Sequence, residues 1–155
     1  MEHQDFLDLR RGSFADFFRV PRALNARGNA NRTLLHTAIS SRKCDIAREL
    51  VRLGVDLNCQ DTAGKTALYY AIEFRMFDLA EELVNKGADP NLVDRFGNNA
   101  VWAAVMQGAD AAPLIRRLVE AGGVFDQKNS AGRSSFDIAE DLELQEIIEI
   151  FGAYR

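Results

Sequence analysis

The tetrapeptide Ala63-Gly64-Lys65-Thr66 has the residue types with which many proteins bind nucleotide phosphates. A phosphate-binding loop of the form G-x-x-x-x-G-K-[ST] surrounds the phosphates with backbone amides and places its lysine beside them. That pattern requires glycine at position 59, where this chain has Cys59, and no apolar strand precedes the motif. We therefore expect no nucleotide-binding site.

His36 is followed by Ser40 and Ser41, which places a potential base close in sequence to two potential nucleophiles. Serine catalysis also needs a group that orients the histidine and donors that stabilise an oxyanion. The sequence shows neither of them. We expect a structural role for His36, no catalytic residues and no enzymatic activity.

Residues that bind transition metals are scarce in this chain. It has two cysteines, Cys44 and Cys59, and its second histidine is His3, which is too few for a zinc site. A carboxylate site would need a pattern such as the D-x-D-x-D-G of calcium loops, which is missing. We expect both thiols to be reduced, and no metal or cofactor to be bound.

Charge is distributed unevenly along the sequence. Residues 1–55 contain ten Lys/Arg and six Asp/Glu, a net +4, and residues 56–155 contain nine and seventeen, a net −8. An acidic surface repels phosphate and favours a basic partner, so we expect no nucleic acid ligand. A simpler alternative is that these acids only solvate a helix surface. The most acidic segment carries Asp137, Glu140, Asp141, Glu143, Glu146 and Glu149.

The composition is that of an ordinary globular protein. The 155 residues are 47% apolar and 27% charged, which suits a single domain. The longest apolar stretch, residues 100–106, is far shorter than the roughly 20 residues of a membrane-spanning helix. The N-terminal residues 1–6 carry acids where a secretory signal is basic and then apolar. We expect a cytoplasmic protein with no membrane association.

A period of 33 to 35 residues organises the chain. Residues 33–38 (TLLHTA) recur as 66–71 (TALYYA), 99–104 (NAVWAA) and 134–139 (SSFDIA). Glycines at 54, 87 and 122 and turns of the form Asp/Asn-x-x-Gly at 61, 94 and 129 keep the same register. Three landmarks in one register indicate a repeat architecture.

Each landmark predicts a structural element. Threonine, asparagine or serine at 33, 66, 99 and 134 can accept hydrogen bonds from free amides, so the first helix of each unit begins there. The second helix carries apolar residues at helical spacing and ends before a glycine, which adopts the left-handed conformation easily. The turns at 61, 94 and 129 suit projecting hairpins. The predicted core residues of the second helices are Ile46, Leu50, Val51, Leu53, Leu79, Leu83, Val84, Leu114, Ile115, Leu118 and Val119.

These motifs resemble the ankyrin repeat family over residues 21–152. The resemblance implies an all-α solenoid of stacked helix pairs with β-turn or hairpin fingers, and a histidine at position 36 that hydrogen-bonds within and between repeats. Some residues depart from the pattern: Asn31 replaces a finger glycine, and two extra residues within 107–113 should lengthen the link between two helices.

We expect one ankyrin repeat domain over residues 1–155. Its predicted parts are an N-terminal cap (1–27), repeats at 28–60, 61–93 and 94–128, and a closing repeat (129–155). Terminal repeats need a polar outer side, because a lone repeat cannot bury its apolar face. The predicted apolar residues of the two caps are Phe6, Leu9, Phe14, Phe17 and Phe18 at one end, and Leu144, Ile147, Ile148 and Phe151 at the other.

Function is expected on side chains that the repeat leaves exposed. By position in the repeat these are Thr37, Ser40, Ser41, Tyr70, Glu73, Phe74, Ala103, Met106 and Gln107. Aromatic residues, Arg and Met are enriched in the centres of protein interfaces. Tyr70, Phe74 or Trp102 could instead pack between neighbouring repeats. The predicted partner-binding residues are Tyr70, Glu73, Phe74, Arg95, Phe96, Trp102, Met106 and Arg133.

Ankyrin repeats mostly bind proteins, which makes a protein partner the expected ligand. Residues 94–105 and 128–134 also resemble ankyrin immunity proteins encoded beside bacterial polymorphic toxins. That resemblance implies a cytoplasmic antidote that occludes a cognate toxin domain. We also expect the free protein to be a monomer. The alternative is an ankyrin adaptor that joins cellular or host proteins without inhibiting them.

Overall fold

The structure is a computed structural model that describes residues 24–155. The predicted helices and apolar residues of the N-terminal cap lie outside the described residues, up to position 23.

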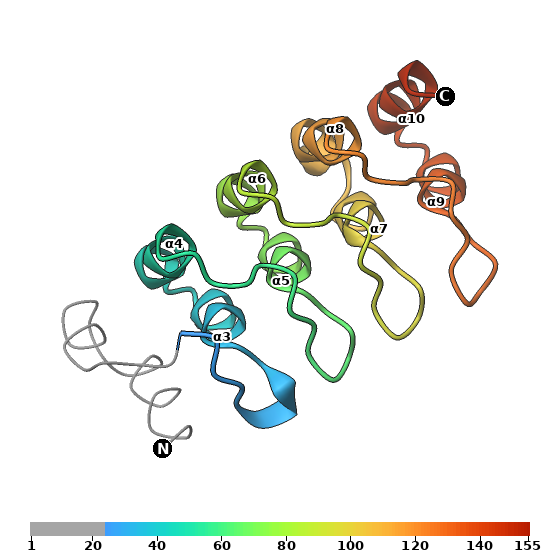
Figure 1. The fold of residues 1–155 in the computed structure, drawn as a ribbon. Coiled ribbons are helices and arrows are strands. Elements are labelled where there is room, and N and C mark those ends of the chain that lie inside the picture. The colour runs from blue at the N-terminus through green and yellow to red at the C-terminus, as the bar shows by residue number, and fades with distance from the viewer. Residues whose placement is uncertain (1–23) are drawn as a thin grey trace.

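The described chain is a single stack of helix pairs (Figure 1). One row, the inner helices, consists of α3, α5, α7 and α9, from which the fingers project. The other row, the outer helices, consists of α4, α6, α8 and α10. The predicted all-α solenoid is confirmed. The helices are α3 (Leu34–Ser40), α4 (Cys44–Arg52), α5 (Ala67–Glu73), α6 (Phe77–Asn85), α7 (Ala100–Val105), α8 (Ala112–Glu120), α9 (Ser135–Asp141) and α10 (Gln145–Ala153), with 3-10 turns η1 (Asn29–Asn31) and η2 (Ala109–Ala111).

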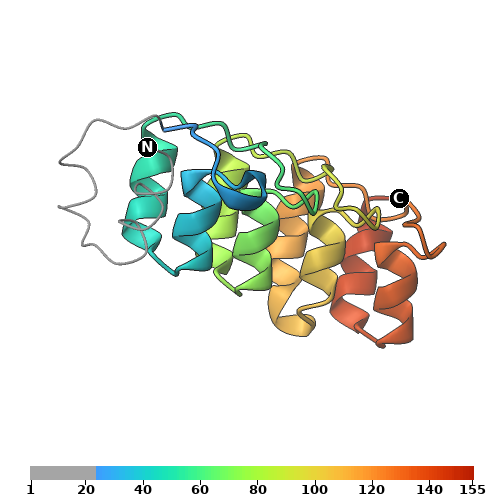
Figure 2. The ribbon, with the colours of Figure 1, turned by 90° about the horizontal axis from the view of Figure 1, so that it is seen from below.

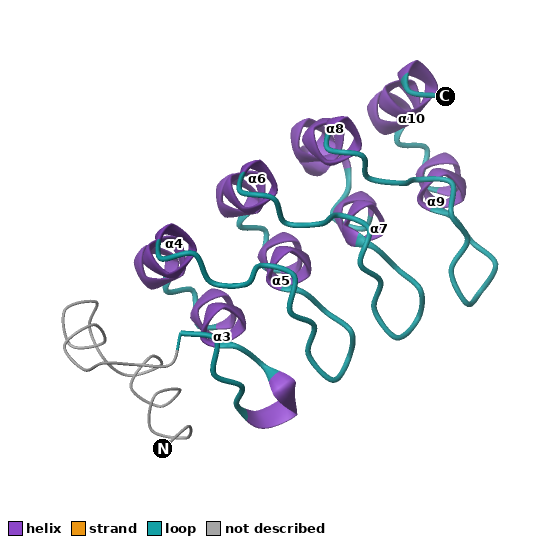
Figure 3. Ribbon diagram, in the orientation of Figure 1, coloured by secondary structure: helices purple, strands orange, loops and turns teal. Residues whose placement is uncertain are grey.

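The fingers are turns rather than paired strands. Over residues 24–155 the ladder-type pairing is limited to one isolated bridge, between Arg27 and Thr33. Figure 3 shows the fingers as loops, apart from the 3-10 turn η1 in the first. Neighbouring fingers are joined at their tips, where the amides of Thr62, Arg95 and Ser130 each donate to a carbonyl of the preceding finger at 2.9 Å.

Each inner helix begins at the residue that the sequence predicted. The side chains of Thr33, Thr66, Asn99 and Ser134 accept hydrogen bonds from amides three residues along, at 3.4, 3.2, 3.0 and 3.1 Å. These contacts satisfy amides that have no partner within the helix. At the other end of a repeat, Gly87 has a φ of 95° just past α6, as predicted.

The core lies between the two rows of helices. Leu50, Leu83 and Leu118 hold the same position in successive outer helices, and all are fully buried. Leu53 is wrong as a core prediction: it is 40% exposed, because it caps the C-terminal end of α4 and lies beyond the buried face. Val51 is half-buried.

In the pair α9 and α10, two of the predicted apolar residues are core residues. Ile147 and Phe151 are fully buried, and the Phe151 ring stacks on Phe125 with 4.5 Å between centroids. Leu144 and Ile148 are half-buried at the outer side of this pair.

The two-residue insertion has the predicted effect. Between α7 and α8 the chain forms the extra turn η2, whereas α5 and α6 are joined by three residues. In Figure 2 the helix-to-helix turns lie along the edge of the stack opposite to the fingers.

Candidate functional site

Phe96 and Met106 are large apolar side chains that the core does not use. Phe96, in the third finger, is 52% exposed, and Met106, just past the end of α7, is 54% exposed. The Arg95 guanidinium lies 4.8 Å from the centroid of the Phe96 ring. Exposed aromatic and methionine side chains beside arginine are the usual anchors of a protein interface. These three predicted residues lie on the accessible surface.

Glu73 and Arg133 are exposed or half-exposed, and both form ion pairs within their own repeat. Glu73 accepts a hydrogen bond from the Lys65 ammonium at 2.6 Å, and Arg133 donates to Asp141. Each pair joins the base of a finger to the end of an inner helix, eight residues later. Solvent-exposed pairs contribute little to stability, so a partner can compete for these charges.

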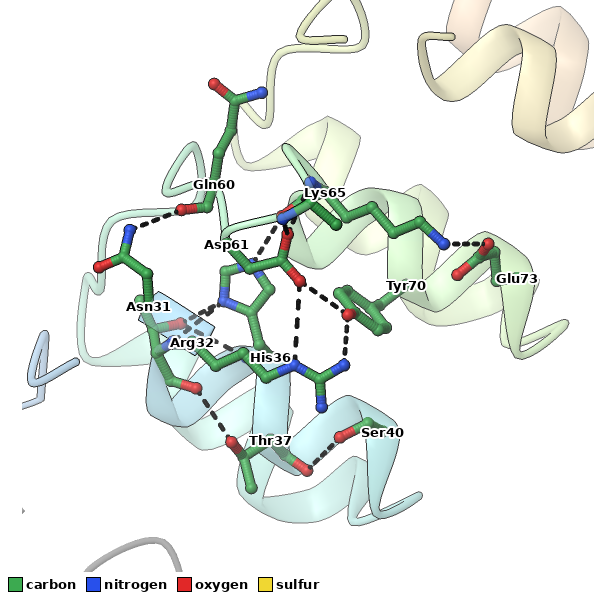
Figure 4. Close-up of polar contacts among 12 residues, drawn as sticks. Asn31, Arg32, His36, Thr37, Ser40, Gln60, Asp61, Lys65, Tyr70 and Glu73 are labelled. Carbon is green, nitrogen blue, oxygen red and sulfur yellow. Dashed lines mark hydrogen bonds and ion pairs between the residues drawn. The ribbon is translucent and has the colours of Figure 1, made fainter. Parts of the chain in front are cut away.

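Tyr70 is wrong as an exposed residue, since it is 7% exposed and packs between repeats. Its hydroxyl donates to Asp61 Oδ2 at 2.8 Å and accepts from the Arg32 guanidinium (Figure 4). Its ring stacks on Phe74 with 6.3 Å between centroids and meets His36 edge to face at 5.7 Å.

Thr37 and Ala103 hold the same position as Tyr70 in α3 and α7, and they are 1% and 3% exposed. The predicted exposure of these two residues is wrong for the same reason. This position is buried in all three repeats, because each inner helix packs against the neighbouring inner helices.

Asp61 is the centre of the network around Tyr70. Its Oδ1 atom accepts from the amides of Ala63 at 2.8 Å and Lys65 at 2.9 Å, which fixes the second finger. Burial alone would raise the pKa of Asp61, yet the hydrogen bonds from Tyr70 and these two amides lower it. The Arg32 Nε atom, 3.9 Å away, adds a favourable charge. The carboxylate therefore stays ionised and holds finger and helix together.

Phe74 and Trp102 are half-buried. Their burial lies between the two alternatives from the sequence, which were exposure to a partner and packing between repeats. Phe74 packs partly against the core and follows the last residue of α5. Because α5 contacts α7, the structure places Phe74 and Met106 at the same end of adjacent inner helices. The fingertip residues Arg95 and Phe96 form a separate group at the opposite edge.

His36 has the structural role that the resemblance implied. Its Nδ1 atom lies 3.2 Å from the Thr33 amide, and its Nε2 atom lies 3.1 Å from the Lys65 carbonyl of the next repeat. Burial lowers the pKa of His36. Tyr69 holds the same position in α5, and its hydroxyl donates to Asp94 in the following finger at 3.1 Å. Both side chains fasten one repeat to the next.

Two exposed positions were missed from the sequence. Leu142, just past the end of α9, is 52% exposed and lies in register with Phe74. Arg42 lies in the turn after α3, with its guanidinium 5.5 Å from the centroid of the Phe74 ring. The 33–35-residue period could have revealed both residues, because they lie one or two positions past the first helix of their repeats.

The comparison with protein families identifies the type of repeat. Residues 18–94 match the model for ankyrin repeats (3 copies). The chain contains ankyrin repeats. A search of curated proteins found no match. Helix pairs with the same geometry continue beyond the matched segment to α10. Ankyrin repeats indicate a protein–protein interaction module, a class that is typically a non-enzymatic scaffold with an extended binding surface.

Residues 24–155 contain no group of three or more His, Cys, Asp or Glu side chains that could hold a metal ion. Cys44 and Cys59 are both free thiols. None of the helices described is both long and apolar enough to cross a membrane.

Proposed function

We propose that this ankyrin repeat protein is a bacterial immunity protein. It binds a cognate toxin domain stoichiometrically in the cytoplasm and neutralises it by covering the toxin's active site or a surface the toxin must move, without chemistry of its own. The observation that carries the proposal is the exposure of Phe96 and Met106, each more than half accessible on a folded stack that has no internal use for them.

Two features of the sequence support an antidote over a general adaptor. Residues 94–105 and 128–134 resemble immunity proteins of polymorphic toxin systems. The net charge of −8 over residues 56–155 suits a basic toxin, such as a nuclease, and steers its approach at low ionic strength. Arg95 beside Phe96 supplies a cation at the fingertip in the middle of this acidic half.

The test is co-expression with the toxin encoded beside the gene in its native genome. We expect restored growth, a 1:1 complex and loss of toxin activity when this protein is in molar excess. The double variant Phe96→Ala, Met106→Ala should lose protection but keep its melting temperature. Tyr154→Ala removes an aromatic side chain of similar exposure (44%) at the far end of the chain and serves as the control.

A toxin that stays fully active in the presence of excess protein rejects the immunity function. If a stable complex still forms under those conditions, the protein is an adaptor that binds without inhibition.

A further inference from the structure

The turns between the helices of each pair share an unusual backbone position. Arg42, Arg75, Gly108 and Glu143 lie in register in the four turns, and their φ angles are 56°, 57°, 86° and 53°. Positive φ favours glycine, because a Cβ atom is crowded there. The third turn holds glycine, so the stack itself requires no charged side chain at this position. Three of the four turns nevertheless retain a charged residue at a conformational cost.

The sign of the charge changes along the stack. The residues in this position are basic, basic, neutral and acidic from the first described pair to the last. Beside them lie the apolar side chains that end the inner helices, Phe74, Met106 and Leu142, the last two more than half exposed. We call this set the turn ridge: Arg42, Arg75, Glu143, Phe74, Met106 and Leu142. The turns that carry it lie along the edge opposite to the fingers (Figure 2), and Phe96 belongs to a finger.

Intramolecular contacts account for part of the turn ridge. Arg75 donates to the Gln107 carbonyl at 3.1 Å and to Asp110 at 2.8 Å, which ties it to the inserted turn. Arg42 lies over the Phe74 ring. These contacts explain the two cations but not the acid at the far end, where Glu143 lies beside exposed Leu142. A persistent cost at a non-glycine position is a reason to look for function.

The geometry points to an amphipathic α-helix of the partner protein that lies along the turn ridge, across the ends of the inner helices. This inference rests on the proposed function in that it names part of the partner. Packed helices are about 8–10 Å apart, so the apolar residues of successive repeats recur at about that distance. Seven residues of an α-helix rise about 10.5 Å. Same-face residues of a strand recur at about 6.6 Å or 13 Å, which fits less well.

Charge complementarity sets the direction of this helix. Its end near Arg42 is acidic, and its end near Glu143 is basic; Arg75 is already paired with Asp110. The helix dipole adds to this preference when the C-terminal end lies beside Arg42, since that end carries partial negative charge. The partner helix therefore presents one apolar residue every seven positions, with basic residues in its N-terminal turns and acidic residues in its C-terminal turns.

A designed peptide tests the inference on the full chain. The probe is a helical peptide of about 21 residues, which spans about 30 Å, with leucine at every seventh position, lysines at its N-terminal end and glutamates at its C-terminal end. The first control has the same composition with the lysines and glutamates mixed evenly along the helix, so that neither end is acidic or basic. The second control carries a central proline, which breaks the helix. Binding is measured by calorimetry and by the methyl signal of Met106 in an NMR spectrum.

We expect the probe to bind, to shift the Met106 methyl signal, and to bind about tenfold more tightly than either control at low ionic strength. Arg42→Gly and Glu143→Gly should each weaken the probe by about threefold to tenfold while the melting temperature stays equal or rises, because glycine relieves the positive φ. Glu146→Gln removes an exposed charge from α10 and should change neither quantity.

Several results overturn the inference: a probe that does not bind, a charge-mixed or proline control that binds equally well, or a Met106 signal that stays in place. Failure of the proposed function can be distinguished from failure of this inference. If the variants Arg42→Gly and Glu143→Gly neutralise a cognate toxin as well as the wild type does, the immunity function stands and the helix on the turn ridge is wrong. If the probe binds as expected but no toxin is neutralised, the turn ridge stands and the immunity function is wrong.

Discussion

The Nε2 atom of His36 lies 3.1 Å from the carbonyl oxygen of Lys65 and joins one repeat to the next. The Thr33 amide donates to Nδ1 of the same ring, so the ring is neutral and carries its proton on Nε2. The hydrogen bond from the Thr33 amide thus requires the neutral form of this side chain, whereas Nε2 donates to the Lys65 carbonyl in either form.

Acid should weaken the fold through His36. Burial lowers its pKa in the folded state below the ordinary value of about 6.5 that it regains on unfolding. Below that value the unfolded chain binds more protons than the folded chain, so stability falls as the pH drops from 7 towards the folded pKa. Urea melts at several pH values should show this slope in the wild type. They should show a flatter slope in His36→Gln, and an equal slope there would contradict the assignment.

Leu83→Ala tests the register of the stack. Leu83 is fully buried in α6, and its truncation should lower the free energy of unfolding by about 2–5 kcal/mol. Leu53→Ala is the matched control, because Leu53 is 40% exposed and should cost less than about 0.5 kcal/mol. Denaturant melts measure both. Similar losses from the two variants would mean that the core is placed incorrectly.

Gly123→Ala should destabilise the third repeat by overpacking. A Cβ atom at Gly123 would lie 2.7 Å from the Leu118 carbonyl oxygen and 2.8 Å from a methyl group of Val101. The backbone oxygen cannot move aside cheaply, so we expect a loss of about 1–3 kcal/mol in the free energy of unfolding. Gly152→Ala, in α10 with no atom within 4 Å of its Cβ position, should leave stability equal or raise it. Calorimetric melting of the two variants checks this contrast.

Much of the fold could be predicted because it depends on contacts between residues close in sequence, and these recur in each repeat. Thr33, Thr66, Asn99 and Ser134 begin helices through contacts with residues three positions away, and such short-range chemistry is visible in sequence. Because the same local pattern recurs in every repeat, each occurrence supports the prediction made from the others.

The candidate site could be predicted only in part, because burial on the inner helices depends on neighbouring repeats. Tyr70 looked like a surface aromatic, yet Asp61 from its own finger and Arg32 from the preceding repeat enclose its hydroxyl. No pattern within one repeat reveals that pairing. Phe96 was predicted correctly as exposed, because the repeat pattern alone places it in a projecting turn.

Tyr70→Phe should destabilise the protein although the ring is kept. Without the phenolic hydroxyl, buried Asp61 loses a donor at 2.8 Å, and an unsatisfied buried group costs about 1–3 kcal/mol. The hydroxyl also helps to lower the pKa of Asp61, so its loss raises that pKa and acid unfolding should begin at a higher pH. Tyr154→Phe removes an exposed hydroxyl, 3.3 Å from Glu120, and is the control. An unchanged acid transition in Tyr70→Phe would contradict the role of this hydrogen bond.

Phe96→Ala should separate binding from folding. The ring is 52% exposed and is not part of the hydrophobic core, so its removal should leave the melting temperature nearly unchanged. At the centre of an interface the same truncation costs about 1–4 kcal/mol of binding free energy. Phe74→Ala is the informative comparison, since Phe74 packs partly against the core and stacks on Tyr70. It should lower both the melting temperature and the affinity. Calorimetric titration with the toxin and thermal melts of the free protein measure the two effects. A drop in melting temperature for Phe96→Ala equal to that of Phe74→Ala would show that the fingertip ring stabilises the stack, and it could then no longer be assigned to the partner.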